Sequence, residues 1–170
     1  MANIEEDLKK VINVKKVVKA VKYLGRFALY RSSEDSTLLI TSNFILNLNA
    51  EQAWEIQCAL LVKTIGKWHT VRKGEPDEDN PVKQSEVDLY FKSVNDTGLN
   101  IIGFTDLYLR NVALYAENGG YVGVDRDYIE MVKNPVVRKS SDGAVIVASE
   151  CHVLAPMKFK DNDYLRPLLF

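Results

Sequence analysis

The sequence predicts an α+β fold in which antiparallel sheets carry helices on one face, built from two helix-plus-meander units. One observation is the order of patterns in residues 121–158, where a short strand, a helical segment and three short strands follow one another. A second is that residues 30–48 repeat the later part of that stretch. A third is the length, because 170 residues without a Pro/Gly/Ser-rich linker can bury one core as a single domain.

Residues 3–25 predict one long helix, because Asn3 with Glu6 makes a capping box and Gly25 is a natural helix stop. The apolar side chains that would pack on a sheet recur at helical spacing: Ile4, Leu8, Val11, Val14, Val18 and Val21. Lysines cover much of the remaining circumference: Lys9, Lys15, Lys16, Lys19 and Lys22. Residues 1–26 carry seven bases and three acids. This charge indicates either a solvated face, arranged as the helix dipole favours, or a helix that faces phosphates.

A second long helix is predicted for residues 49–66, after short strands at 26–31, 37–41 and 44–48. Asn49 would be its N-cap and Gln52 its capping-box partner. Two apolar stripes run along it, one formed by Trp54, Cys58, Leu61 and Ile65 and the other by Ala53, Ile56 and Leu60. A helix of this kind packs on two sides or presents one side to a partner chain. We expect Trp54 in the core and Gln57 as a buried amide with its hydrogen bonds satisfied.

The centre of the chain is predicted to add strands and one polar loop. Residues 67–72 alternate as a strand. The most polar stretch, Gly74 to Pro81, is expected to be an exposed acidic loop, and it lacks the spacing of a calcium-binding loop. Residues 86–94 alternate apolar and polar side chains, which predicts a strand that turns back into residues 99–104 as a hairpin.

The C-terminal unit has a local signal for every element. The predicted elements are a strand at 121–124, a helix at 125–132 and strands at 136–139, 144–148 and 151–155. Asp125 would cap the helix, Asn134-Pro135 would end it and Asp142-Gly143 would turn a hairpin. The earlier unit aligns with this one, with residues 31–33 on 139–141, 35–36 on 142–143 and 38–42 on 145–149. Hairpins of this length share turn residues and alternation, but we expect a true duplication.

Composition limits the classes of function. The formal net charge of -1 argues against a generally basic nucleic-acid binder, although charge can be segregated between faces. Two cysteines, Cys58 and Cys151, in apolar settings favour a reducing compartment without a disulfide framework. The N-terminal residues lack an apolar signal segment and no run is long enough for a membrane span, so a cytoplasmic protein is expected.

The C-terminal pattern resembles the end of bacterial DNA polymerase sliding clamps. The residues that carry this resemblance are Val122-Gly123-Val124, Tyr128-Ile129, Pro135-Val136-Val137, Asp142-Gly143 and Ala155-Pro156-Met157-Lys158. The other half-unit of that family has a Thr-Asp-x-x-x-Leu element, and this chain is similar with Thr41 and Leu46 but has Ser42 in place of the aspartate. The resemblance implies one clamp-like domain, with half-units at about 4–48 and 121–158 and an insertion at 49–120.

The resemblance also implies a function. By this resemblance the protein would be a non-enzymatic module of a phage or mobile-element type. It would contact duplex DNA or bind a replication or defence protein. The implied DNA contacts are Lys9, Lys15, Lys16, Lys19, Lys22, Arg126 and Lys133. A groove for a partner peptide would involve Pro156, Met157, Leu168, Leu169 and Phe170. A ring around DNA would need six copies, so a homo-oligomer is expected. No cofactor is expected for such a module. The alternative is an interaction or inhibitor protein with no role on DNA.

A small enzyme is the remaining hypothesis, and His69 or His152 would then be its catalytic groups. Cys151 neighbours His152, so on a strand the two side chains point to opposite faces and cannot form a nucleophile–base pair. Asp125 and Asp127 are better explained as the cap and the first-turn acid of a helix. Two histidines without a cysteine cluster argue against a zinc site, and no Walker or G-x-G-x-x-G motif occurs.

Overall fold

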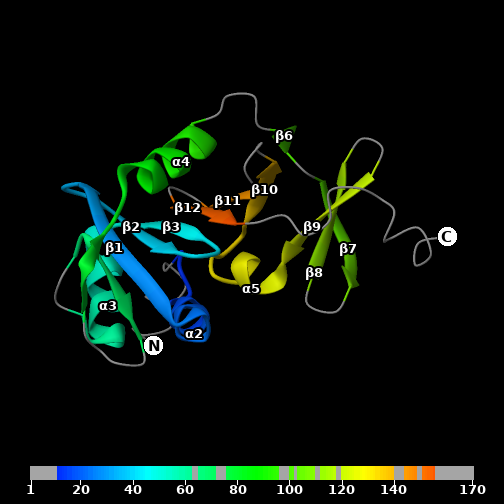
Figure 1. Ribbon diagram of the computed structural model, residues 1–170. Helices are drawn as coiled ribbons and strands as arrows, with labels where there is room; N and C mark the ends of the chain where they lie inside the picture. The colour runs from blue at the N-terminus through cyan, green and yellow to red at the C-terminus, as the bar shows by residue number, and fades with distance from the viewer. Residues whose placement is uncertain are drawn as a thin grey trace.

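The computed structural model describes residues 11–62, 65–71, 76–95, 100–101, 103–109, 112–117, 120–139, 144–148 and 151–155 (Figure 1). Within these ranges the helices are α2 (Val14–Leu24), α3 (Ala50–Leu60), α4 (Gln84–Val94) and α5 (Arg126–Ile129). The strands of the main sheet are β1 (Arg26–Ser33), β2 (Ser36–Thr41), β3 (Ile45–Leu48), β4 (Lys67–Thr70), β5 (Pro76–Pro81), β6 (Asn100–Ile101), β10 (Val136–Lys139), β11 (Ala144–Ala148) and β12 (Cys151–Ala155). A separate sheet contains β7 (Gly103–Leu109), β8 (Val112–Glu117) and β9 (Gly120–Asp125). The predicted α+β class is confirmed.

Among the described residues, the main sheet has nine strands in the order β5-β4-β1-β2-β3-β12-β11-β10-β6. Two meanders, β1-β2-β3 and β10-β11-β12, therefore lie edge to edge in one sheet. They are joined where Leu46 pairs with Val153 and Ile45 with Leu154. A helix precedes each meander, α2 before β1 and α5 before β10. The strands predicted for residues 136–139, 144–148 and 151–155 are confirmed with the same bounds. Their duplication from one ancestral unit stays a prediction.

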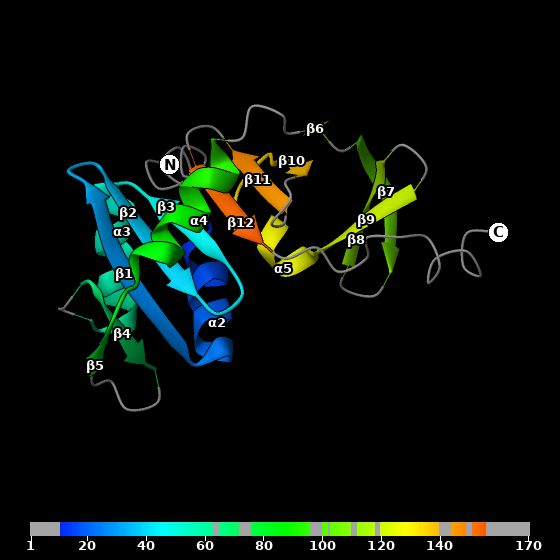
Figure 2. The same cartoon turned by 45° about the horizontal axis from the view of Figure 1, so that its top comes forward.

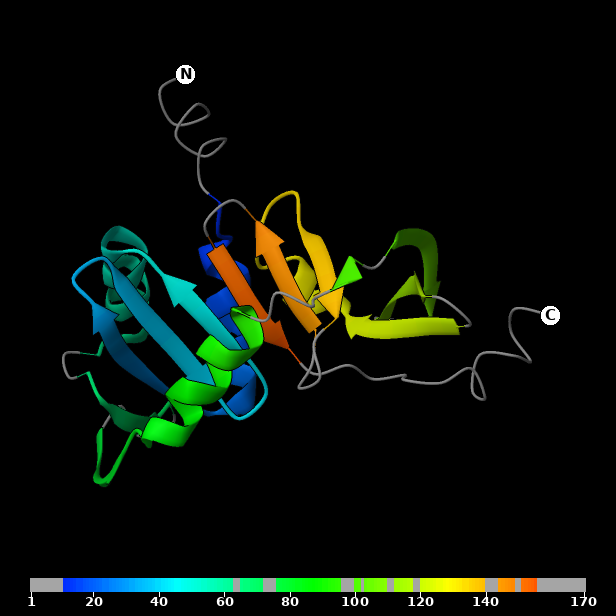
Figure 3. The same cartoon turned by 90° about the horizontal axis from the view of Figure 1, so that it is seen from above.

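Helices cover both faces of the sheet, so the prediction of helices on one face is wrong (Figure 2). Val17 and Val21 of α2, Ala53 and Ile56 of α3 and Tyr128 of α5 belong to one buried cluster. The other face is covered by α4 and has its own cluster (Figure 3). The prediction fails because residues 86–94, whose alternation predicts a strand, belong to the helix α4.

The spacing of the buried residues in α4 explains this error. Val87 and Tyr90 are buried and Val94 is half-buried, which is helical spacing, whereas the alternating positions Leu89 and Phe91 are 41% and 39% exposed. The start is set by a local signal, because the Glu86 carboxylate accepts a hydrogen bond of 3.1 Å from the backbone N–H of Lys83. The predicted hairpin with residues 99–104 is also wrong. β6 pairs with β10, and β7 pairs with β8.

Both long helices are shorter than predicted. α2 begins at Val14, with Asn13 as its N-cap, because Ile12 makes a β-bridge to Val132 instead of continuing the helix. Residues 1–10, with the predicted Asn3 cap and Lys9, lie outside the described residues. α3 has the predicted Asn49–Gln52 capping box but ends at Leu60, since Leu61 adopts a left-handed conformation with φ of 56°.

Three further expectations need correction. Trp54 is 66% exposed and is not in the core, while Gln57 beside it is half-buried. Residues 76–81 of the expected acidic loop form β5, which pairs with β4, and residues 74–75 lie outside the described residues. The expected helix at 125–132 is the single turn of α5, although Asp125 caps it as predicted. The strand expected at 121–124 is confirmed as part of β9.

Candidate functional site

α2 presents a stripe of lysines away from the sheet. Val17 and Val21 are fully buried, and Lys15, Lys19 and Lys22 are exposed at i, i+4 and i+7 on the opposite side of the helix. α2 contains no acidic residue, and Lys22 lies in its last turn, where the helix dipole favours a cation. The helix is held at both ends, by the Asn13 side chain that accepts from the Lys16 N–H at 3.3 Å and by Gly25 with φ of 80°. We call Lys15, Lys19 and Lys22 the lysine stripe.

Two other predicted DNA contacts, Lys16 of α2 and Arg126 of α5, form ion pairs with the same carboxylate at the end of α5. The Lys16 ammonium donates to the Glu130 carboxylate at 2.9 Å, and the Arg126 guanidinium donates to the same carboxylate at 2.6 Å. The hydrogen bond from Lys16, together with Arg126, holds the pKa of Glu130 below its ordinary value of 4.5, against the opposing effect of burial. A phosphate would have to compete with Glu130 for these two cations, so they are weaker candidates than the lysine stripe.

The α5 side of this surface is mixed in charge. Asp125 and Asp127 flank Arg126, and Asp125 accepts a hydrogen bond of 3.0 Å from the Asp127 N–H as the helix cap. Lys133 is exposed beyond α5, and its backbone N–H donates to the Val11 carbonyl at 2.8 Å. A cavity of about 380 Å³ between the two helices is lined by both signs of charge and by aromatic rings: Lys16, Lys19, Tyr23, Asn43, Asp125, Asp127 and Tyr128. Lys19 therefore borders both the outer side of α2 and this cavity of mixed charge, whereas the lining does not include Lys15 or Lys22.

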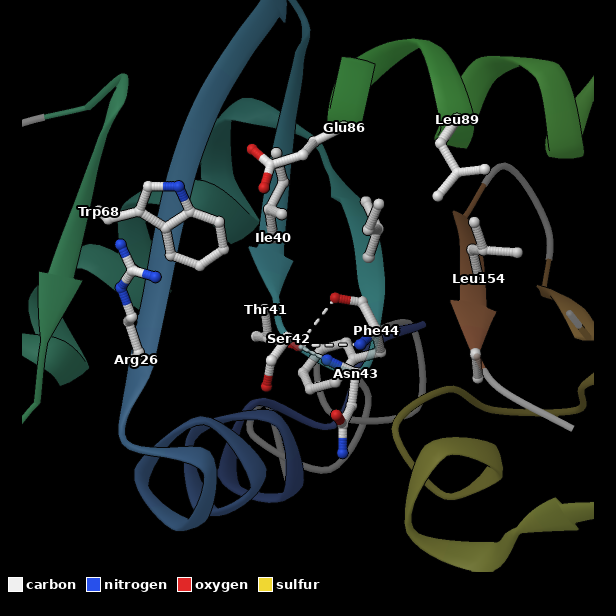
Figure 4. Close-up of a pocket in the computed structure, with 12 residues that line it drawn as sticks. Arg26, Ile40, Thr41, Ser42, Asn43, Phe44, Trp68, Glu86, Leu89 and Leu154 are labelled. Carbon is white, nitrogen blue, oxygen red and sulfur yellow. Dashed lines mark hydrogen bonds between the residues drawn. The ribbon is translucent and has the colours of Figure 1, made fainter. Parts of the chain in front are cut away.

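A second cavity, of about 420 Å³, lies on the opposite face of the sheet, below α4 (Figure 4). Its apolar lining comes from Ile40, Ile45, Leu89 and Leu154, and its polar lining includes Arg26, Ser42, Asn43 and Glu86. The Arg26 guanidinium lies 4.5 Å from the centre of the Trp68 ring, which also lines the cavity. The turn after β2, which forms one wall of the cavity, is held by the Thr41 hydroxyl, which accepts from the Phe44 N–H and donates to the Phe44 carbonyl, both at 2.9 Å (Figure 4).

The second cavity also borders the end of β12. Ala155 lines it, and Pro156 is the next residue in the sequence. The predicted partner-binding residues Pro156, Met157, Leu168, Leu169 and Phe170 all lie outside the described residues. Sequence reasoning did not select Arg26, Trp68 or Glu86 as site residues. One sequence signal for this cavity was available: if residues 84–94 are assigned to a helix, the i, i+3 spacing of Glu86 and Leu89 places these two side chains on the same side of that helix.

The two histidines do not form a site together. His69 is 4% exposed and stacks on Phe27 at 5.4 Å between ring centres, on the face covered by α2 and α3. His152 pairs in register with Val147, whose side chain packs under α4, so it points to the other face. Within the described ranges, no group of histidine, cysteine or carboxylate side chains could hold a metal ion.

No family model, curated protein or solved structure matches this chain. Across the part of the chain that the structure describes, no helix combines the length and apolarity needed to cross a membrane.

Proposed function

We propose that this protein is a non-enzymatic, clamp-like module that contacts the phosphates of duplex DNA through the lysine stripe of α2. The observation that carries the proposal is the stripe itself, three exposed lysines on one side of a helix that contains no acid. A row of cations at this spacing favours a polyanion over a compact anionic ligand, because successive lysines can meet successive phosphates.

The arrangement of strands supports the clamp-like part of the proposal. In the sliding-clamp family each domain consists of two half-units back to back, each with a helix before a meander. Here β1-β2-β3 and β12-β11-β10 meet at the β3–β12 pair, and α2 and α5 precede them on the same face of the sheet. The lysine stripe then lies on the outer side of a helix that belongs to this layer.

Binding of this kind is independent of DNA sequence and sensitive to salt. Each neutralised phosphate releases condensed counterions and adds about -0.9 to the slope of log affinity against log salt, so three contacts give about -2.7. One domain with so few contacts should bind duplex DNA with a dissociation constant on the order of 10⁻⁴ to 10⁻⁶ M. Lys16 and Arg126 add less, because each would have to leave Glu130.

The test is a salt titration of duplex binding, followed by fluorescence anisotropy. The variant Lys15→Gln/Lys19→Gln/Lys22→Gln should lose about 2.7 units of the slope with no change in unfolding, since all three side chains are exposed. The matched control is Lys83→Gln/Lys92→Gln, which removes exposed lysines at α4 on the other face and should keep the slope. An unmodified protein that does not bind at about 50 mM salt rules out the proposal. An equal loss of slope per charge in both variants shows that net charge, and not the stripe, is responsible.

A second candidate function, binding of a protein segment, is favoured by the cavity below α4. Its apolar lining, together with the charged groups of Arg26 and Glu86 at its rim, is typical of a site that takes an apolar side chain and orients the chain that carries it. Its position beside Ala155 also agrees with the expectation that Pro156, Met157 and the C-terminal residues contribute to a partner groove. If the lysine stripe binds no DNA, this candidate takes its place.

A further inference from the structure

The cavity between α2 and α5 adjoins the lysine stripe. Lys19 belongs to the stripe and also lines this cavity of about 380 Å³, together with Tyr23, which lies one turn later on α2. The Tyr23 side chain is 89% exposed, so its ring is accessible to a ligand. A polyanion held along the stripe therefore passes the mouth of the cavity.

The aromatic and apolar lining of the cavity suits a flat ring. Tyr128 of α5 lines it and is only 7% exposed, and its ring packs against Phe44 at 5.4 Å between ring centres. This contact restricts the Tyr128 ring, while Tyr23 stands on the α2 side. Ala20 and Leu24 add apolar surface beside Tyr23. Nucleobases are flat and stack on aromatic side chains in proteins that bind single strands.

The charged groups of the cavity are divided between its two walls. Lys16 and Lys19 come from α2, whereas Asp125 and Asp127 come from the start of α5. The Lys16 ammonium pairs with Glu130 at 2.9 Å, so Lys19 is the stronger candidate for a phosphate. A small anion inside the cavity would meet the carboxylates, and a small cation would meet the ammonium groups. A cytosine nucleotide matches both walls, because its phosphate is anionic and its amino group donates to carboxylates.

We propose that this cavity receives one unpaired base of the DNA that the lysine stripe holds, with a preference for cytosine. The inference rests on the proposed function, because the stripe must first bring DNA to the cavity. Lys19 binds the phosphate beside the unpaired nucleotide, and the base lies against Tyr23 and Tyr128. The amino group of the base donates to the carboxylates at the start of α5.

The same arrangement distinguishes DNA with an unpaired base from intact duplex. A base in an intact duplex must be unpaired and unstacked before it can enter a pocket, and this costs free energy. A base that is already unpaired avoids most of this cost. The volume of about 380 Å³ lies at the lower end of the range for small-ligand sites, which suits one nucleotide rather than several.

The first experiment compares three duplexes by fluorescence anisotropy at about 50 mM salt. One is fully paired, one carries a single unpaired cytosine, and one carries an abasic residue at that position. The unpaired cytosine should bind more tightly than the abasic residue by at least about fivefold, the low end of the effect of one base–aromatic stack. Tyr23→Ala should remove most of this difference without changing unfolding, since the side chain is exposed. The matched control is Trp54→Ala, which removes an exposed aromatic ring on α3 and should keep the difference.

The second experiment tests the carboxylates with an unpaired thymine, which has a carbonyl oxygen where cytosine has its amino group. The unmodified protein should bind the cytosine duplex about fivefold more tightly than the thymine duplex. Asp125→Asn/Asp127→Asn should bring this ratio close to one, and the fold should persist because asparagine caps a helix about as well as aspartate. The ratio cancels the change in net charge, which affects both duplexes equally. The matched control is Glu34→Gln/Asp35→Asn, which neutralises two exposed acids outside the cavity lining and should keep the ratio.

The outcomes separate this inference from the proposed function. Equal binding of the paired, cytosine and abasic duplexes overturns the inference and leaves the proposed function standing. A protein that binds none of them overturns both. A cytosine advantage that persists in Tyr23→Ala and in Asp125→Asn/Asp127→Asn places the unpaired base elsewhere and overturns the inference alone.

Discussion

The carboxylate of Glu130 connects α2 to the end of α5, the two helices that precede the meanders. It accepts hydrogen bonds from Lys16, which is 114 positions earlier in the chain, and from Arg126 in α5, the helix that Glu130 caps at its C-terminal end. These cations hold its pKa below the ordinary value of 4.5. A carboxyl group with a lowered pKa stabilises the folded state at pH values above its unfolded pKa, and this stabilisation is lost as the pH falls through the folded pKa.

Replacement of Glu130 should therefore have an effect that depends on pH. At pH 7 we expect Glu130→Gln to lower the free energy of unfolding by up to about 1 kcal/mol, the range of partly exposed ion pairs. The gap between the variant and the unmodified protein should close as the pH falls well below 4.5, because the native carboxylate is then protonated as well. Urea unfolding at pH 7 and at acidic pH measures this difference. Lys16→Gln serves as the second arm of a double-mutant cycle, and an equal gap at both pH values would refute the role of the pair.

At the scale of the element, α4 shows how burial selects between two periods. The same residues offer a period of two, Val87, Leu89 and Phe91, and a helical period, Val87, Tyr90 and Val94. The helical set faces the sheet cluster that contains Ala28, Leu38 and Leu154. Glu86 supplies the start signal through its bond to the Lys83 N–H.

Two alanine substitutions in α4 distinguish a helix from a strand. Tyr90→Ala should cost about 3 kcal/mol of unfolding free energy, because the ring is 3% exposed and its removal leaves a cavity. Leu89→Ala should cost less than about 1 kcal/mol, since that side chain is 41% exposed. Chemical denaturation provides both values. The reverse order, with Leu89→Ala the more costly change, is what a strand would give and would contradict α4.

At the scale of the whole molecule, the two meanders share one sheet and both of its buried clusters. Leu46 and Val153 come from different meanders and lie in the same cluster as α2, α3 and α5. Ala155, the last residue of β12, belongs to the buried cluster that also contains residues of α2, α3 and α5, and it lines the cavity below α4. Residues 166–170 follow this point and are the expected partner-binding end of the chain.

Deletion of residues 166–170 should keep the fold and alter the cavity. If residues 166–170 serve a partner groove, as the proposed clamp-like function implies, the melting temperature should change by no more than a few degrees, because a groove for a partner adds little to the core. In a Trp54→Phe background, Trp68 reports on the cavity by its fluorescence, and the deletion should shift its emission if the C-terminal residues contribute to the groove. A large loss of thermal stability would instead assign these residues to the core.

The sequence by itself determined the elements whose signals are local. The strands β10, β11 and β12 and the caps at Asn49 and Asp125 follow from turn residues, alternation and side chains that bond within a few positions. Only the tertiary structure decided that residues 84–94 form a helix, that Trp54 is exposed, and that Lys16 meets Glu130. The physical reason is that burial depends on what covers each face, and a pattern along the chain contains no information about the partner that lies opposite it in space. α4 covers the second face of the sheet, whereas the described chain places nothing over Trp54.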